Sequence, residues 1–192
     1  GLKIPEIFDA AINKEVKGLW IIGEDIVQTD PNSNHVIQAM EALDLLVVQE
    51  IFMSETAKYA DVVLPGTTFL EKDGTFTNTE RRVQRVNRAA EPLPGTKPDG
   101  VIVTDMMQKL GYDQKTYDAD EVLAEIADIV PFFKGITRER LGKLGLQWPV
   151  KEDGSDTKIL HEKEFKLGKG RLKYFDWKES SEISKNKKEY PL

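Results

Sequence analysis

Three short, mainly apolar runs, each ending in polar or turn residues, restrict this chain to a small group of folds. They lie at residues 19–22, 45–48 and 60–65, and the last of them closes on a proline. A short apolar run is typical of a strand that is buried on both faces, as parallel strands in α/β proteins are. Residues 36–43, between the first two runs, have the apolar spacing of an amphipathic helix. Strand, loop, helix and strand over about thirty residues predict a βαβ unit with a right-handed crossover.

Further helices are predicted around this sheet. Apolar spacing and capping residues favour helices at residues 6–13, 54–59, 101–110 and 119–129. In the third of these, Met106, Met107 and Leu110 share one stripe before Gly111. In the fourth, Asp118 or Asp120 is the cap, and Val122, Ile126 and Ile129 are expected to face inward.

The second half of the chain has a different pattern. Residues 71–88 predict a loop or irregular hairpin, 137–145 read as helical, and the alternation over 163–177 predicts a two-stranded ribbon. The predicted fold class is therefore α/β: a Rossmann-like, mostly parallel sheet flanked by helices, with a C-terminal helical and β-ribbon extension.

Charge divides the chain at about the same place. Residues 1–133 contain 12 basic and 23 acidic side chains, whereas residues 134–192 contain 15 and 10. We therefore predict an α/β domain at 1–133 and an extension at 134–192, whose lysine-rich end at 178–188 stays extended without a partner. Because the chain starts at Gly1 and not at a methionine, we expect a piece of a longer protein, or a processed one.

Composition excludes several kinds of chemistry. The chain has no cysteine and only two histidines, His35 and His161, so we expect no disulfide, no thiolate zinc site, no iron–sulfur cluster and no histidine metal cluster. A net charge of −6 argues against a nucleic-acid or anionic-membrane binder, and no apolar run is long enough for a membrane span. We expect no catalytic residue and no metal ligand within this chain.

The ends of the three strands predict a ligand crevice, because ligands bind at the carboxyl edge of open parallel sheets. Residues 23–25, 49–50 and 65–68 should line this edge. Gly23 would allow a ligand close to the backbone, and Asp25 could accept two hydrogen bonds from a guanine edge, although a helix N-cap is an equally good interpretation of Asp25.

Other polar residues near these strand ends are weaker candidates. Thr29 and Gln49 are candidates for ribose or base contacts, against the simpler explanation that polar residues end strands. Gly66 could offer a backbone N–H to a phosphate. The chain lacks a GxGxxG or Walker pattern, which argues against an ordinary nicotinamide or ATP site.

Four arginines form a basic cluster in the acidic half of the chain. Their guanidinium groups suit phosphate or carboxylate contacts, but a solvated face paired with Glu71, Glu80 and Glu91 is the more common arrangement. The four are Arg81, Arg82, Arg85 and Arg88.

The tract at residues 53–84, which contains the run EKDGTFTNTERRVQ, resembles the molybdopterin oxidoreductase family, the relatives of dimethyl sulfoxide reductase. Several shorter motifs are most similar to formate dehydrogenase alpha subunits, and the likeness extends over about residues 1–177. These motifs lie at residues 23–25, 28–30, 48–52, 97–99, 137–141 and 147–149. The ending at residues 189–192 resembles the entry into that family's last β-rich domain.

This resemblance implies a cofactor of molybdenum or tungsten held by two molybdopterin guanine dinucleotides, which oxidises formate to carbon dioxide. Electrons then pass to iron–sulfur clusters, including a 4Fe-4S cluster in a part of the protein that precedes this one. The matching positions imply cofactor contacts from Gly23, Asp25, Thr29, Gln49 and Asp99. At Gly66 some formate dehydrogenases have a serine, so only a backbone contact is implied there.

The resemblance also implies partners. They are the remaining domains of the same chain, electron-transfer subunits and the substrate formate, in a cytoplasmic enzyme. We expect this piece alone to be inactive and to hold no cofactor tightly. Three alternatives remain. The first is another molybdopterin oxidoreductase, such as a nitrate reductase or the large subunit of respiratory complex I. The others are a scaffold module of the same fold without cofactor and a free-standing small-molecule binding domain.

Overall fold

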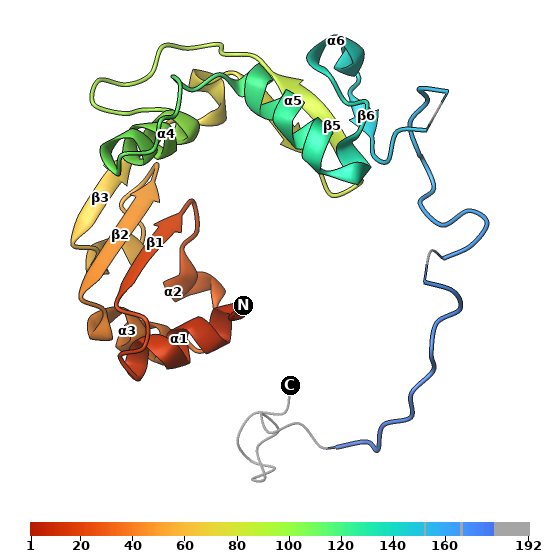
Figure 1. The fold of residues 1–192 in the computed structure, drawn as a ribbon. Coiled ribbons are helices and arrows are strands. Elements are labelled where there is room, and N and C mark those ends of the chain that lie inside the picture. Colours follow the sequence, from red (N-terminus) through yellow and green to blue (C-terminus); the bar gives the residue numbers. More distant parts are fainter. Residues whose placement is uncertain (152, 166, 179–192) are drawn as a thin grey trace, which may run out of the picture. The chain divides into compact units, whose positions relative to one another are not determined.

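The computed structural model describes residues 1–151, 153–165 and 167–178 (Figure 1). By its contacts the chain forms two units, residues 1–158 and 159–192. None of the helices in the described ranges is long and apolar enough to cross a membrane. The prediction for residues 178–188 lies almost wholly outside the described residues, and the predicted domain boundary after residue 133 stays a prediction.

A parallel sheet of three strands organises the first part of the chain. Its strands are β1 (Gly18–Ile22), β2 (Leu45–Glu50) and β3 (Val62–Pro65), in the order β1-β2-β3. Trp20 pairs with Val47, and Val47 with Val62, so the strands run in register along a shared direction. This confirms the predicted α/β class and the three predicted strands.

Helices cover one face of this sheet, because alternate residues of the strands meet the apolar stripes of α1 (Ile4–Ile12), α2 (Ile26–Thr29) and α3 (Ser33–Ala42). The short 3₁₀ helix η1 (Thr56–Tyr59) completes this side. Asn32 caps α3 by accepting a hydrogen bond from the His35 backbone N–H at 3.2 Å. The buried core contains Phe8, Ala11, Ile21, Ile26, Val36, Ala39, Met40, Leu46, Val48 and Ala57.

An antiparallel sheet follows, after the 3₁₀ helix η2 (Phe69–Glu71). Strands β4 (Gly74–Thr77) and β5 (Arg82–Val86) form the predicted hairpin, and β6 (Leu146–Gln147) pairs with β5 from far along the sequence. Its core is small and consists of Val83, Leu123, Ile136 and Leu141. The last three come from α5 (Ala119–Ile129), the loop after η3 (Pro131–Phe133), and α6 (Arg138–Leu141).

Two helices bury other residues than those expected. In α5 the buried residue is Leu123, whereas Val122 and Ile129 are exposed, because the small core accepts only a narrow stripe of the helix. In α4 (Asp99–Lys109) the buried apolar residue is Ile102, and Leu110 just beyond the helix is 79% exposed. Asp118 caps α5, as predicted, by accepting hydrogen bonds from the backbone of Asp120 and Glu121.

The ribbon predicted at residues 163–177 is wrong, since the described residues of this range contain no strand. Leu167, Leu172, Tyr174 and Trp177 alternate as in a strand but are almost fully exposed. The physical reason is that two isolated strands are marginally stable in water unless a third strand or a helix covers their apolar face.

Candidate functional site

The carboxyl ends of the three parallel strands lie together, as predicted. The Gly23 N–H donates to the Gln49 carbonyl at 2.8 Å, and the Gly66 N–H donates to the Glu50 carbonyl at 3.1 Å. Gly66 also forms a parallel bridge with Lys97, which extends this edge beyond β3. The structure therefore brings Gly23, Gln49, Gly66 and the start of α4 to one edge of the sheet.

Gly23 leaves open space at the end of β1. Its φ of +64° lies in the left-handed region, which favours glycine over residues with a Cβ atom. A Cβ placed there would have no atom within 4 Å, so nothing in the described residues fills the space above it. A flat or charged group could approach the backbone at this position.

The Asp25 carboxylate faces into the protein and has four donors around it. One oxygen accepts from the Thr56 N–H at 2.9 Å and the Thr56 hydroxyl at 2.6 Å. The other accepts from the Glu55 N–H at 3.3 Å and Gln28 Nε2 at 2.6 Å. Its side chain makes no N-cap bond to α2, although it precedes that helix. Asp25 therefore fastens the loop after β1 to the start of η1.

These bonds set the charge of Asp25. Desolvation raises its pKa, but the hydrogen bonds from Thr56, Gln28 and Glu55 outweigh it, so the pKa lies below its ordinary value. The carboxylate stays ionised, and its acceptor positions are already occupied by protein donors. Asp25 acts as a support of the edge in this structure.

Gln49, Asp99 and Lys72 form a second polar group at the edge. Gln49 is fully buried and its Nε2 donates to Asp99 Oδ1 at 2.8 Å. Lys72 forms an ion pair with the other Asp99 oxygen and donates to the Thr67 carbonyl at 3.4 Å. Asp99 lies so near Gly66 that a Cβ on Gly66 would be 3.0 Å from the carboxylate. A side chain at position 66 would therefore push the Asp99 carboxylate aside by a few tenths of an ångström.

Only part of this group reaches the surface. The Asp99 side chain is 38% exposed and that of Lys72 24%, whereas Gln49 lies behind them. Desolvation raises the pKa of Asp99, but bonds from Lys72 and Gln49 bring it below the ordinary value. Asp99 is thus an ionised acceptor, with Gln49 and Lys72 fixing its position.

Thr29, one turn into α2, is exposed, and its hydroxyl reaches Glu24 at 3.5 Å.

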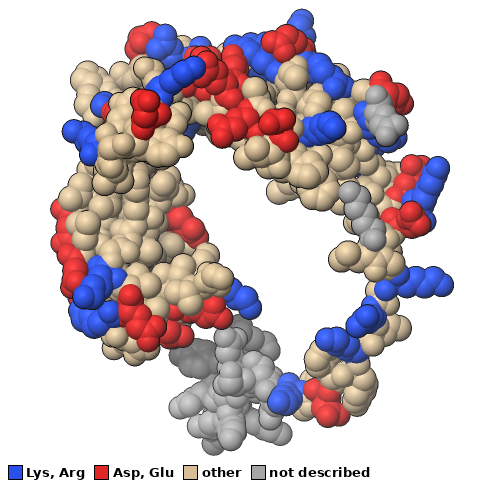
Figure 2. Space-filling view, in the orientation of Figure 1, with Lys and Arg blue, Asp and Glu red and all other residues tan. Residues whose placement is uncertain are grey.

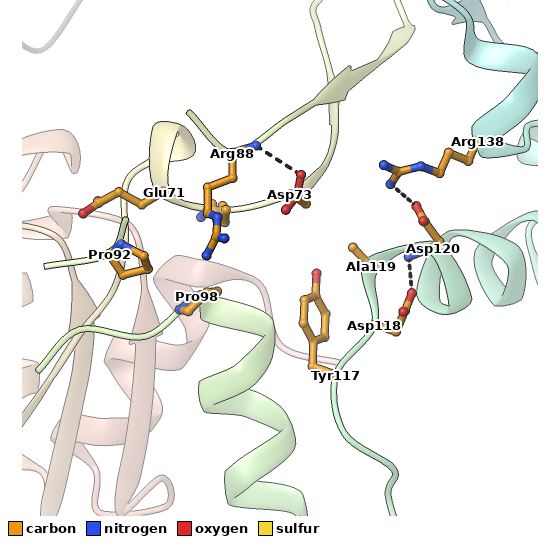
Figure 3. Close-up of a pocket in the computed structure, with 11 residues that line it drawn as sticks. Glu71, Asp73, Arg88, Pro92, Pro98, Tyr117, Asp118, Ala119, Asp120 and Arg138 are labelled. Atoms are coloured by element: carbon orange, nitrogen blue, oxygen red, sulfur yellow. Dashed lines mark hydrogen bonds and ion pairs between the residues drawn. The ribbon is translucent and has the colours of Figure 1, made fainter. Parts of the chain in front are cut away.

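A cavity of about 540 Å³ lies next to Lys72 (Figure 3). Figure 3 shows Tyr117, Arg88 and Asp73 pointing into its centre, with Arg138 held by Asp120 at one side. A smaller cavity of about 200 Å³ shares Lys72 and Tyr117 with it and includes Asp99. The polar edge of the sheet therefore opens toward a larger space.

Tyr117 lines both cavities and packs against the first turn of α4. Its ring packs so closely on Gly100 that a Cβ at that position would be 2.1 Å from a ring carbon. Burial raises the pKa of the Tyr117 phenol, and the charges of Asp118, Asp99 and Asp120 add to this effect. The phenol is neutral at physiological pH and can donate a hydrogen bond into the cavity.

The arginine cluster is paired within the protein. The Arg81 guanidinium binds the carbonyls of Trp148, Thr157 and Lys158, and lies 5.5 Å from the centre of the Trp148 ring. Arg82 pairs with Glu80 and Asp156, and Arg88 with Glu91. The pairing with glutamates that the sequence favoured is confirmed for Arg82 and Arg88, and the guanidinium groups of Arg81 and Arg82 also hold distant segments of the chain together.

Three residues of the edge were missed by the sequence reasoning. Lys72 and Thr56 lie inside motifs that the resemblance covers, but no local pattern says that they face Asp99 and Asp25. Tyr117 lies between two predicted helices, and no local signal marks it. The role of Lys72 comes from its contact with Asp99, 27 positions away, and that of Thr56 from its contact with Asp25, 31 positions away.

Comparison with known proteins finds relatives that match the whole chain. A family model described as Molybdopterin oxidoreductase matches residues 1–109. The F420-dependent formate dehydrogenase subunit alpha of Methanocaldococcus jannaschii is 44% identical over 100% of this chain and 29% of its own length. The F420-dependent formate dehydrogenase 2 subunit alpha of Methanococcus maripaludis is 43% identical, with the same two shares. The chain therefore spans less than a third of these relatives.

A solved structure has a similar fold. Acetylene hydratase from Pelobacter acetylenicus matches 56% of this chain and 16% of its own length, with a TM-score of 0.52 and 24% identity. This likeness concerns the arrangement of the strands and helices alone.

Proposed function

The chain belongs to the molybdopterin oxidoreductase family, and on that premise we propose that it is part of the alpha subunit of a formate dehydrogenase. The observation that carries this proposal is the likeness over the whole chain to two subunits of that name, at 43% and 44% identity. Its role in such an enzyme is to bind one guanine dinucleotide of the cofactor.

The exposed groups at the edge fit such a ligand. Asp99 is an ionised acceptor for the N–H groups of a guanine base or for ribose hydroxyls. Lys72 lies beside it and suits the negative charge of a diphosphate, whereas the buried Gly66 gives its N–H to the Glu50 carbonyl and makes room for the Asp99 carboxylate. Gly23 leaves room for close approach, and Thr29 adds an exposed hydroxyl. Gln49 and Asp25 hold these groups in position from behind.

The chain's contribution is binding and orientation. When bound, the molybdenum or tungsten cofactor supplies the two-electron oxidation of formate to carbon dioxide. Asp99 and Lys72 fix the nucleotide end of the cofactor, and the bonds of Asp25 to Thr56 keep the β1 end in place. We further propose that electrons leave through a 4Fe-4S cluster and electron-transfer subunits outside this chain, in a cytoplasmic enzyme.

An NMR titration of the isotopically labelled chain with GDP, and separately with ADP, tests this assignment. We expect saturable chemical-shift changes at Gly23, Thr29 and Gly66 with GDP, and clearly weaker ones with ADP. Asp99→Asn should weaken GDP binding by about tenfold, since a charge-assisted bond is lost. The matched control is Asp105→Asn on the same helix, where Asp105 pairs with Lys97. Absence of GDP binding, or equal effects of both substitutions, would contradict the proposal.

A further inference from the structure

The ion pair between Lys72 and Asp99 occupies the carboxylate that the proposed function assigns to the guanine base. The Lys72 ammonium donates to Asp99 Oδ2, and Gln49 Nε2 donates to Oδ1 at 2.8 Å. The N–H groups of a guanine edge form a planar pair of donors, which is best accepted by both oxygens of one carboxylate, as the pair in a guanidinium group is. The base therefore meets an acceptor whose second oxygen a cation already holds.

The Asp99 carboxylate itself is fixed in place. Asp99 begins α4, and the Tyr117 ring packs on the next residue, Gly100, so closely that a Cβ there would lie 2.1 Å from a ring carbon. Gln49 is fully buried, and its Oε1 has no hydrogen-bond partner among the described residues that would draw the amide away from Asp99. The Gly66 backbone closes another side, since a Cβ there would be 3.0 Å from Oδ1. The open side of the carboxylate is the one toward the cavity of about 200 Å³.

Lys72 lies on that open side and is the partner that can leave. Its side chain is 24% exposed and lines both this cavity and the larger one of about 540 Å³. Its hydrogen bond to the Thr67 carbonyl is long, at 3.4 Å. A lysine ammonium is a point charge on a flexible stem with three rotatable donors, so it can exchange one acceptor for another without a fixed geometry. The ammonium can therefore turn from Asp99 to an anion in the cavities while its backbone stays in place.

Phosphate is the chemistry that would draw the ammonium away. Arg88 and Arg138 line the larger cavity too, but Arg88 pairs with Glu91, and Arg138 with Asp120 at 2.6 Å. Figure 2 shows Asp and Glu side chains beside Lys and Arg side chains over the region of α4 and α5, so an anion must compete with carboxylates there. A diphosphate carries more negative charge than one carboxylate and forms charge-assisted bonds with ammonium groups. A neutral nucleoside gives Lys72 no acceptor of this kind.

We propose that Lys72 makes recognition of the guanine base depend on the diphosphate. In the unliganded chain its ammonium occupies Asp99 Oδ2, and on binding it transfers to the phosphate oxygens, which frees the carboxylate for the base. Lys72 is thus a specificity-determining residue, through which the site discriminates against the same base without phosphate. This inference rests on the proposed function, which assigns Asp99 to the base, but that function does not require the transfer.

Binding of guanosine and of inorganic diphosphate, separately and together, tests the transfer by NMR titration of the labelled 192-residue chain. Saturating diphosphate should tighten guanosine binding by about tenfold, because the first ligand removes the competitor of the second. In Lys72→Met, guanosine alone should bind about tenfold more tightly than to the unsubstituted chain, and diphosphate should no longer change its Kd.

Two further variants make the test specific. Lys97→Met is the matched control, because Lys97 forms a similar ion pair with Asp105 of α4 but lines neither cavity next to Asp99. It should bind guanosine and diphosphate as the unsubstituted chain does. Lys72→Arg should act in the opposite direction to Lys72→Met and weaken guanosine binding by about threefold, because a guanidinium binds a carboxylate through two parallel bonds. This variant keeps the positive charge beside Asp99, so the test does not depend on one substitution.

The outcomes separate this inference from the proposed function. Independent binding of guanosine and diphosphate, in a chain that binds GDP, would overturn the transfer and leave the proposed function intact. Guanosine binding that is unchanged or weaker in a folded Lys72→Met chain would do the same. Absence of GDP binding to the unsubstituted chain would overturn both.

Discussion

In the parallel-sheet region, ten buried apolar side chains from β1, β2 and four helices form the core, whereas the described residues around the antiparallel sheet bury four. The second region is held instead by arginines that bind backbone carbonyls of other segments. Arg81 binds the segment from Trp148 to Lys158, and Arg140 binds the carbonyls of Gly135 and Gly154.

This difference shows how a region with little apolar area can still be ordered. Guanidinium groups offer five donors in a fixed plane, so that one arginine can satisfy several carbonyls of irregular loops. Hydrogen bonds to a charged group contribute more than neutral ones, but they depend on geometry and not on area. The parallel region should therefore lose most stability when volume is removed, and the antiparallel region when an arginine is removed.

The largest expected effect comes from a matched pair of leucines. Leu46→Ala in the ten-residue core should lower the free energy of unfolding by about 4 kcal/mol, and Leu141→Ala in the four-residue core by about 2.5 kcal/mol. Both side chains are fully buried, but the smaller core can collapse more easily around a cavity. Urea denaturation measures both values. Equal losses would show that the two cores are equally rigid.

The next effect concerns Arg81. Arg81→Met keeps an apolar stem against Trp148 but removes the guanidinium bonds, and should cost about 2 kcal/mol. Hydrogen exchange should increase at residues 146–158 and stay unchanged at residues 45–50. The control is Arg85→Met, because Arg85 is exposed and contacts Asn87 two residues away. If Arg81→Met had no more effect than its control, the role assigned to the guanidinium would be wrong.

The smallest effect separates two helix caps by their response to pH. Asn32→Ala at the start of α3 should cost about 1 kcal/mol at any pH, whereas Asp118→Ala at the start of α5 should destabilise only when Asp118 is ionised. Backbone hydrogen bonds from Glu121 and Asp120 hold the pKa of Asp118 below its ordinary value.

The sign of that pH dependence follows from this lowered pKa. The unfolded carboxyl binds its proton at a higher pH than the folded one, so stability from this cap is complete above about pH 5. It is lost as the pH falls through the ordinary value of about 3.9 and then through the folded pKa. Urea midpoints of the two variants at pH 7 and pH 3 measure it. An Asp118→Ala deficit that is as large at pH 3 as at pH 7 would contradict the assignment.

The parallel-sheet region was the more predictable of the two. Its strands and α3 follow from short-range patterns, because continuous apolar runs and helical spacing are properties of neighbouring residues. The edge at Gly23, Gln49 and Gly66 followed from the same patterns, since parallel strands end on one side of a sheet. The roles of the individual residues at that edge did not follow from these patterns. Whether Asp25 faces a ligand or Thr56 depends on a contact 31 positions away.

The antiparallel region shows the opposite case. The hairpin of β4 and β5 was predictable from Asp73-Gly74 and the alternation after it. The pairing of β6 with β5 and the bonds of Arg81 join residues more than sixty positions apart, and no local pattern contains them. The ribbon expected at 163–177 failed for a related reason, because alternation predicts a strand only where another surface buries its apolar side.

The sequence by itself determined the elements of the parallel sheet, the edge at which they end and, through its motifs, the family. Those properties depend on the order of apolar, polar and turn residues, which is local. Only the tertiary structure decided which polar groups support the edge and which are exposed on it. These depend on which distant atoms come within hydrogen-bonding reach once the core has formed, because donors and acceptors pair by distance and direction and not by position in the chain.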